Sequence, residues 1–211
     1  MAYVNIVAQS SESTVVTEYK PQAKRSEAYQ SETELEREFI RLLQELGYEY
    51  LPIHKEKDLV DNLRFQLETV NGYRFSDEEW GRFFSEVLAN PKSGIVEKTR
   101  LIQEDFVQVL RRDDGSSKNI TLFVKKNIHN NRLQVINQYT VSKEEGAAHD
   151  NRYDVTVLVN GLPMVHIELK RRGVPIREAF NQIDRYQRDS FWAASGLFEY
   201  VQIFVVSNGT N

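Results

Sequence analysis

The sequence predicts an α/β fold of the α+β type, in which a mixed β-sheet is flanked by helices, and three features support this prediction. An amphipathic helical pattern follows Ser31, and strand-like segments recur between residues 104 and 170. A helical pattern at 175–188 then separates a strand at 164–170 from a strand at 199–206. Because a helical crossover joins parallel strands, we expect the last strand to lie parallel to 164–170.

The first helix opens with a capping box, because Ser31 is followed three residues later by Glu34. It ends at Gly47. Its apolar positions recur at helical spacing: Leu35, Phe39, Leu42, Leu43 and Leu46. The opposite face is acidic and includes Glu32 and Glu36.

Two further helices are predicted at residues 57–70 and 77–89. The second opens with another capping box, formed by Ser76 and Glu79, and carries the aromatic residues Trp80 and Phe83. We expect the two helices to form a small helical insertion, about residues 57–100, with the aromatic stripe in the core.

Strands are predicted at residues 104–111, 119–125 and 133–141, separated by turn-forming sequences. Residues 1–30 are rich in Ser, Glu and Lys, and we expect a loosely held N-terminal arm with at most one edge strand. Residues 31–211 would then form one folded domain.

The composition excludes several classes of protein and several kinds of chemistry. The 211 residues are 40% hydrophobic and 11% aromatic, which is enough for one domain with a substantial core. With no cysteine there is no disulfide, thiolate catalysis or cysteine-based zinc site, and we expect a cytoplasmic protein. We expect no membrane association, because no apolar run approaches membrane-spanning length and no signal peptide opens the chain. The net charge of −4 argues against strong unaided DNA binding.

The segment 152–170 is mostly apolar but contains Asp154, Glu168 and Lys170, and its pattern predicts two strands around the turn Asn160-Gly161. On the second strand, Glu168 and Lys170 share one face and lie about 6.6–7 Å apart along the strand. Asp154 starts the preceding strand. Two carboxylates at one end of a sheet can hold a hard cation through oxygen, with the ammonium beside a water or a phosphate.

The pairing register decides whether these groups meet. A two-residue loop at Asn160-Gly161 would pair residue 154 with residue 167 and send Asp154 to the other face. A three-residue loop would pair 154 with 168 and bring the carboxylates together. We therefore predict a three-residue loop with a bulged glycine.

The residues also resemble a known family. Asp154 followed by Glu168-Leu169-Lys170 resembles the PD-(D/E)xK motif of nucleases, and Gln182 to Tyr186 resembles the QxxxY motif of RecB-type members. Longer stretches resemble the N-terminal nuclease domain of the R (motor) subunit of type I restriction enzymes: SETELEREFIRLLQELGYEYL, NRYDVTVLVNGLPMVHIELKRRG, IREAFNQIDRYQRDSF and FVVSNGTN. The resemblance covers about residues 30–211. Tyr153 departs from the motif, which has a proline there, but that proline is not a ligand.

The resemblance implies a restriction-endonuclease-like core with helices on both faces. It also implies that Asp154 and Glu168 ligate Mg²⁺, together with the main-chain carbonyl of Leu169. Lys170 would orient or deprotonate the attacking water, or stabilise the phosphate in the transition state. The reaction would be in-line hydrolysis of a phosphodiester.

Several accessory residues have two interpretations. Gln182 and Tyr186 share one helix face and would contact DNA phosphate or position Lys170, or form an ordinary helix face. His166 is expected to be packed or hydrogen-bonded rather than a ligand. Glu36 is a candidate first-helix carboxylate near the metal, although a solvated face is the simpler interpretation. A basic cluster would steer phosphate or mark a solvated helix start: Lys170, Arg171, Arg172, Arg177, Arg185 and Arg188.

As implied by the resemblance, the chain is a fragment of a bacterial R subunit whose C-terminal motor hydrolyses ATP and translocates double-stranded DNA. No G-x-x-x-x-G-K-[ST] phosphate loop occurs in these residues, so ATP would bind only to the full-length subunit. The partners would be DNA, the motor, and methyltransferase and specificity subunits. Two alternatives are a nuclease-like module that binds DNA and regulates the motor without cutting, and a free-standing repair or junction nuclease.

Overall fold

The computed structural model describes residues 3–9, 15–20, 31–171 and 173–208. In the predicted N-terminal arm, β1 (Tyr3–Gln9) and β2 (Val15–Lys20) pair antiparallel, so this region has a two-stranded hairpin rather than at most one strand. The rest of the arm, residues 1–2, 10–14 and 21–30, lies outside the described residues.

A five-stranded mixed sheet forms the centre, in the order β3-β6-β7-β8-β9. Its strands are β3 (Glu49–Tyr50), β6 (Leu133–Val141), β7 (Asn151–Val159), β8 (Leu162–Leu169) and β9 (Ile203–Ser207). β6, β7 and β8 pair antiparallel, whereas β3 with β6 and β8 with β9 pair parallel. The predicted mixed sheet, including its parallel last strand, is confirmed.

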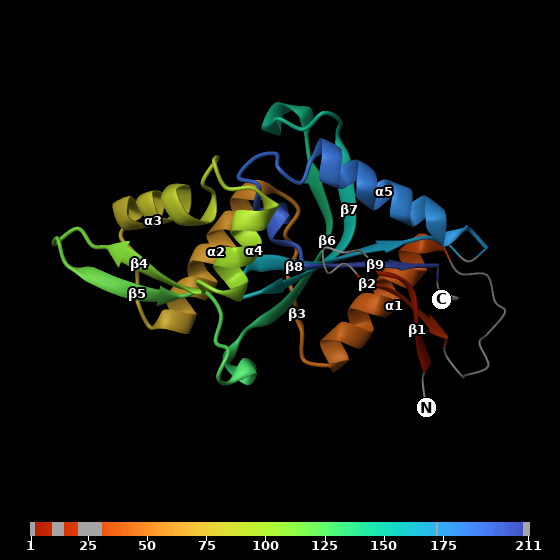
Figure 1. The fold of residues 1–211 in the computed structure, drawn as a ribbon, viewed down its shortest axis with the longest axis horizontal. Helices are drawn as coiled ribbons and strands as arrows, with labels where there is room; N and C mark the ends of the chain where they lie inside the picture. The colour runs from red at the N-terminus through yellow and green to blue at the C-terminus, as the bar shows by residue number, and fades with distance from the viewer. Residues whose placement is uncertain (1–2, 10–14, 21–30, 172, 209–211) are drawn as a thin grey trace.

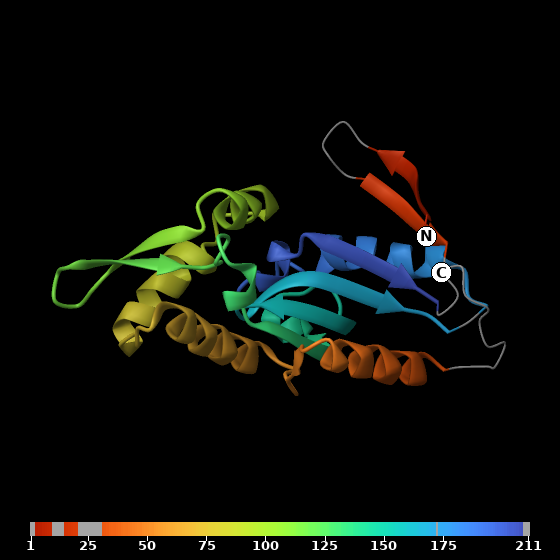
Figure 2. The same ribbon diagram turned by 90° about the horizontal axis from the view of Figure 1, so that it is seen from below.

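Helices cover both faces of this sheet, as Figures 1 and 2 show for α1 (Glu32–Glu45) and α5 (Ile176–Asp189). Ile40 of α1 packs with Val155 and Ile167 in a small apolar cluster. Tyr186 of α5 belongs to the larger cluster on the other side of the sheet. α5 connects β8 to β9, so the crossover that makes these strands parallel is itself part of the core.

The region predicted to be a helical insertion lies at the far end of the molecule from α1 and α5 (Figure 2). It contains α2 (Glu56–Asn71), α3 (Asp77–Phe83), the π-helical turn η1 (Phe84–Leu88) and α4 (Ile95–Gln103). The strand predicted at 104–111 begins later, at β4 (Val107–Arg111), and pairs with β5 (Ser117–Thr121) in a separate sheet. Trp80 and Phe83 are buried, which confirms the prediction of a core aromatic stripe.

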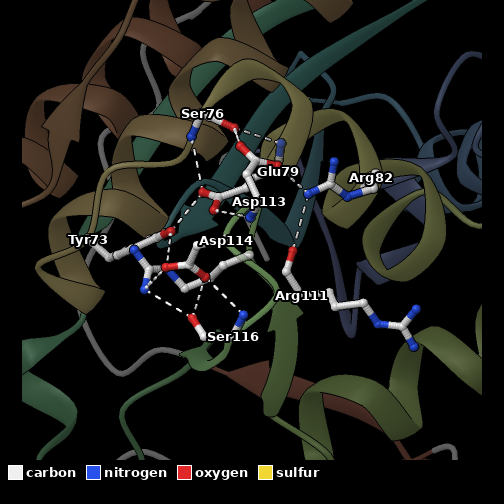
Figure 3. Close-up of polar contacts among 9 residues, drawn as sticks. Tyr73, Ser76, Glu79, Arg82, Arg111, Asp113, Asp114 and Ser116 are labelled. Atoms are coloured by element: carbon white, nitrogen blue, oxygen red, sulfur yellow. Dashed lines mark hydrogen bonds and ion pairs between the residues drawn. The ribbon is translucent and has the colours of Figure 1, made fainter.

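Polar side chains join α3 to the turn between β4 and β5 (Figure 3). Glu79 is buried and accepts hydrogen bonds from the Tyr73 hydroxyl at 2.7 Å and from the backbone N–H groups of Ser76 and Asp113. Arg82 forms an ion pair with Asp113 at 2.7 Å. These bonds satisfy the buried carboxylate and fix the hairpin against the helix.

Three short 3₁₀ helices complete the described fold: η2 (Ile128–Asn130), η3 (Lys143–Glu145) and η4 (Leu197–Tyr200). Within the described ranges, no helix combines the length and apolar character needed to cross a membrane.

Candidate active site

The turn between β7 and β8 has two residues, so the predicted three-residue loop is wrong. Val159 pairs with Leu162, and both Asn160 (φ 51°) and Gly161 (φ 84°) have positive φ, as a type I′ turn requires. Packing fixes this turn, because a Cβ on Gly161 would lie 2.7 Å from the Cα of Leu63.

The extra residue that shifts the pairing register of β7 and β8 lies inside β8 and not in the turn. Leu158 pairs with Pro163, but Val157 pairs with Val165, which leaves Met164 as a β-bulge. Beyond the bulge Val155 pairs with Ile167, and continuing this register puts residue 154 opposite residue 168. The expected pairing of the two carboxylate positions therefore occurs, produced by a bulge rather than by a longer loop.

Asp154, Glu168 and Lys170 lie together where β7 begins and β8 ends. The Lys170 ammonium donates to Glu168 Oε1 at 3.2 Å, and the backbone N–H of Leu169 donates to Asp154 Oδ2 at 2.9 Å. Glu168 is completely buried and the Lys170 side chain is 14% exposed. An acid pair and a base thus share one mostly dehydrated corner, where electrostatic interactions are stronger than in water.

Both acids resist ionisation. Burial, and after it the negative charge of Glu168, raises the pKa of Asp154 to about 6. Burial raises the pKa of Glu168 to about 6 as well, against the opposing effect of the Lys170 charge. A bound cation would offset both the lost hydration and the repulsion between the carboxylates.

One oxygen of Glu168 accepts no hydrogen bond from the part of the chain that the structure describes. Its buried Oε2 lies 3.4 Å from the Nε2 of His166, and neither atom has a hydrogen-bond partner among the described residues. Burial lowers the pKa of His166 to about 4, so its ring is neutral at pH 7. His166 packs edge-on against Tyr153 and Tyr186, in agreement with the expected packed histidine. Since a buried carboxylate oxygen without a donor is costly, this oxygen suits a cation.

These residues fit a hard divalent cation that keeps part of its water shell. Among the described residues no three His, Cys, Asp or Glu side chains are grouped to hold a metal. Mg²⁺ commonly uses only one or two protein carboxylates and retains several waters. Asp154 and Glu168 provide two such groups, and the free Oε2 of Glu168 is the observation that favours the fit.

A cleft of about 620 Å³ opens beside Asp154, between α1, β6 and β7. It is also lined by Glu36, Arg37, Gln138 and Arg152. Glu36 is buried, so the solvated-face interpretation of this residue is wrong. It accepts hydrogen bonds from the amides of Asn137 and Gln138. The acidic face of α1 is therefore partly turned toward the sheet.

Comparison with known sequences identifies the family. The profile of the family described as "Type I restriction enzyme R protein N terminus" matches residues 29–211. The chain belongs to this family.

Relatives of this R-protein N-terminal domain are named as endonuclease subunits. The Type I restriction enzyme EcoprrI endonuclease subunit of Escherichia coli is 48% identical over 206 residues, 97% of this chain and 64% of the relative. The SauMSSORF170P endonuclease subunit of Staphylococcus aureus (strain MSSA476) is 41% identical over 187 residues, 86% of this chain and 19% of the relative. The chain thus spans less than two thirds of the length of these curated relatives.

In the R-protein N-terminal domain, Gln182 and Tyr186 form one hydrogen-bonded pair. The Gln182 amide donates to the Tyr186 hydroxyl at 2.5 Å, and that hydroxyl donates to the carbonyl of Arg152 at 2.8 Å. Tyr186 is 1% exposed, and burial, followed by the charge of Glu168, raises its pKa to about 12. The pair therefore holds β7 two residues before Asp154, and no hydrogen bond among the described residues joins it to Lys170.

The described residues of the predicted basic cluster differ in their surroundings. Arg171 and Arg185 are exposed, and the Arg185 guanidinium lies 5.4 Å from the centre of the Tyr186 ring. Arg188 forms an ion pair with Asp189 at 2.8 Å. Arg172 lies outside the described residues. The backbone N–H of Arg171 donates to Glu32, so it is Glu32 of α1 that reaches the end of β8.

Sequence reasoning missed the residues that border the site from β6 and β7. Gln138 has a positive φ of 52° in mid-strand, and Arg152 lines the cleft. The only available signal was the polar pair Asn137-Gln138, which interrupts an otherwise strand-like segment. Nothing in the sequence separates such a pair from an ordinary solvent-facing position.

Proposed function

We propose that this chain is the divalent-cation-dependent endonuclease domain of a type I restriction R subunit, and that it hydrolyses phosphodiester bonds of double-stranded DNA. The observation that carries the proposal is the buried corner formed by Asp154, Glu168 and Lys170, in which Glu168 Oε2 has no hydrogen-bond partner among the described residues. Membership of the R-protein family and the names of the relatives also support the proposal of an endonuclease domain.

The roles follow from the chemistry of the three side chains. Asp154 and Glu168, with the main-chain carbonyl of Leu169, would hold Mg²⁺, which when bound polarises the phosphate and lowers the pKa of a water. Lys170 lies 3.2 Å from Glu168 Oε1, so its ammonium is oriented toward the metal-binding carboxylate. From there it would orient the attacking water or stabilise the negative charge of the phosphate in the transition state.

The wider setting belongs to the same proposal. The full-length subunit would bind ATP, translocate DNA with its motor, and cut within a complex of methyltransferase and specificity subunits in the bacterial cytoplasm. A net charge of −4 fits a nuclease domain to which the motor delivers DNA, rather than one that captures DNA alone.

The test uses the full-length subunit in its assembled complex. Asp154→Ala, Glu168→Ala and Lys170→Ala should each abolish DNA cleavage while ATP hydrolysis continues. Normal cleavage by any of these variants would refute the role of that residue. Mn²⁺ binding to the wild-type chain, measured by calorimetry and lost in Asp154→Ala, would support the catalytic reading. Complete absence of binding to the intact subunit would favour a module that binds DNA and regulates the motor.

A further inference from the structure

Gln138 and Asp154 face each other at a break in the pairing of β6 with β7. The paired residues run from Leu133 and Val159 to Asn137 and Val155, and resume at Tyr139 and Tyr153. Gln138 has φ 52°, a left-handed conformation that is unfavourable for residues other than glycine. A residue held in this way beside a candidate active site needs a stabilising contact.

At this break, each strand changes which of its alternate side chains face α1. Val155 packs in the apolar cluster on the α1 side of the sheet, whereas Tyr139 and Tyr153 pack in the cluster on the other side. In a regular strand, residues two apart share one face. Asp154 therefore sits where β7 changes face, and it both lines the cleft and accepts the hydrogen bond from the Leu169 N–H.

Glu36 supplies the stabilising contact. Its Oε1 accepts from the Asn137 amide at 2.5 Å, and its Oε2 accepts from the Gln138 amide. Neighbouring residues of a regular strand point to opposite faces, so these two amides can meet one carboxylate because Gln138 is left-handed. These hydrogen bonds thus stabilise β6 with Gln138 in its left-handed conformation.

We propose that Glu36 is a positioning residue that acts through the left-handed backbone of Gln138 to hold Asp154 in place. Both carboxylate oxygens of Glu36 are already occupied by amide donors, so Glu36 acts on the site through β6 rather than as a metal ligand. Its catalytic consequence rests on the proposed nuclease function, but its structural consequence does not.

The decisive experiment compares Glu36→Ala, Gln138→Gly and the double variant. Mn²⁺ affinity is measured by calorimetry, and exchange of the Leu169 amide hydrogen, which bonds to Asp154, is measured by NMR. Glu36→Ala should weaken Mn²⁺ binding by about 10- to 100-fold and accelerate the exchange. Gln138→Gly should stay near wild type, because glycine adopts positive φ without a tether. The double variant should therefore recover both properties. A double variant as defective as Glu36→Ala, or an unchanged Glu36→Ala, would overturn the proposal.

Three further variants guard against simple misfolding. Gln138→Ala keeps the unfavourable backbone and loses the amide, so it should behave like Glu36→Ala. Glu36→Gln should stay near wild type, because the Gln138 amide can rotate and accept from the new amide, whereas a metal ligand would not tolerate this change. Glu38→Ala, on an exposed part of the same helix where Glu38 pairs only with Arg41 among the described residues, is the matched control.

The two proposals fail in different ways. If wild-type protein binds no Mn²⁺, or binds it equally after Asp154→Ala, the nuclease proposal fails. Exchange at the Leu169 amide still decides the role of Glu36. If Mn²⁺ binding depends on Asp154 but neither measurement responds to Glu36→Ala, only the positioning role is refuted.

Discussion

Glu79 in the helical insertion and Glu168 in the central sheet are both buried, but their surroundings act in opposite directions. Burial would raise the pKa of Glu79, yet hydrogen bonds from Tyr73 and from the backbone of Asp113 and Ser76 lower it below its usual value. Burial raises the pKa of Glu168 to about 6, and its Oε2 has no hydrogen-bond donor among the described residues. Figure 3 shows how many donors converge at the insertion.

The difference separates a structural carboxylate from one available to a ligand. The hydrogen bonds to Glu79 stabilise its charge, and so the folded protein, without any bound ligand. At Glu168 the carboxylate charge is only partly stabilised by the protein, so binding of a cation there would be favourable. Sites of this kind trade stability for function, because the unsatisfied group is destabilising until its ligand binds.

The largest expected effect comes from neutralising each glutamate in turn. Glu168→Gln should reduce DNA cleavage by the assembled complex by about a hundredfold or more, because it removes a charge that is proposed to bind the metal. Glu79→Gln should leave the cleavage rate per folded molecule unchanged and lower the free energy of unfolding by about 1–3 kcal/mol. Cleavage assays and urea unfolding would measure these effects. Equal losses of cleavage in both variants would remove the distinction.

The turns of the two hairpins offer the next comparison. Gly161 and Gly115 both have positive φ, but a Cβ on Gly161 would meet the backbone of Leu63, whereas Gly115 has nothing within 4 Å. Gly115→Ala should cost about 1 kcal/mol of unfolding free energy, and Gly161→Ala about 3 kcal/mol or more. Chemical denaturation of both variants tests this. Similar costs would show that packing does not fix the turn of the site.

The pH dependence should differ in sign between the two regions. The raised pKa values of Asp154 and Glu168 contribute stability that is present below pH 4 and lost as pH rises through about 6. The lowered pKa of Glu79 contributes stability above its unfolded value that is lost as pH falls. In EDTA, Asp154→Asn should therefore be more stable than wild type by about 1–3 kcal/mol at pH 8 and equal to it at pH 4. A constant difference across this range would contradict the raised pKa.

A smaller effect is expected from single hydroxyl groups. Tyr186→Phe loses the hydrogen bond to the Arg152 carbonyl, and Tyr200→Phe loses one to the Leu88 carbonyl at 2.9 Å. Each should cost about 1 kcal/mol of unfolding free energy. Only Tyr186→Phe should also slow cleavage, because Arg152 precedes Asp154 by two residues. Cleavage slowed equally by Tyr200→Phe would indicate a general loss of stability.

Local signals accounted for much of the fold. The capping boxes at Ser31 and Ser76 are both formed, and the strand over 133–141 was predicted with its observed limits. α4 was missed, since residues 95–103 begin after Gly94, which has no side chain to mark a helix start. The predicted three-residue loop was wrong, but the expected register of β7 and β8 occurs. A bulge within a strand shifts the register by one residue, as a longer loop would, and the sequence did not distinguish the two.

The sequence by itself determined most of the helices and strands of the central sheet and its flanking helices, and it singled out Asp154, Glu168 and Lys170, because periodicity and residue type are local properties of the chain. Only the tertiary structure decided that Glu36 is buried against Asn137 and Gln138, and that, among the residues described, Glu168 has an oxygen without a hydrogen-bond donor while Glu79 does not. Whether a carboxylate finds donors depends on segments distant in the chain that pack beside it, and no local pattern encodes that.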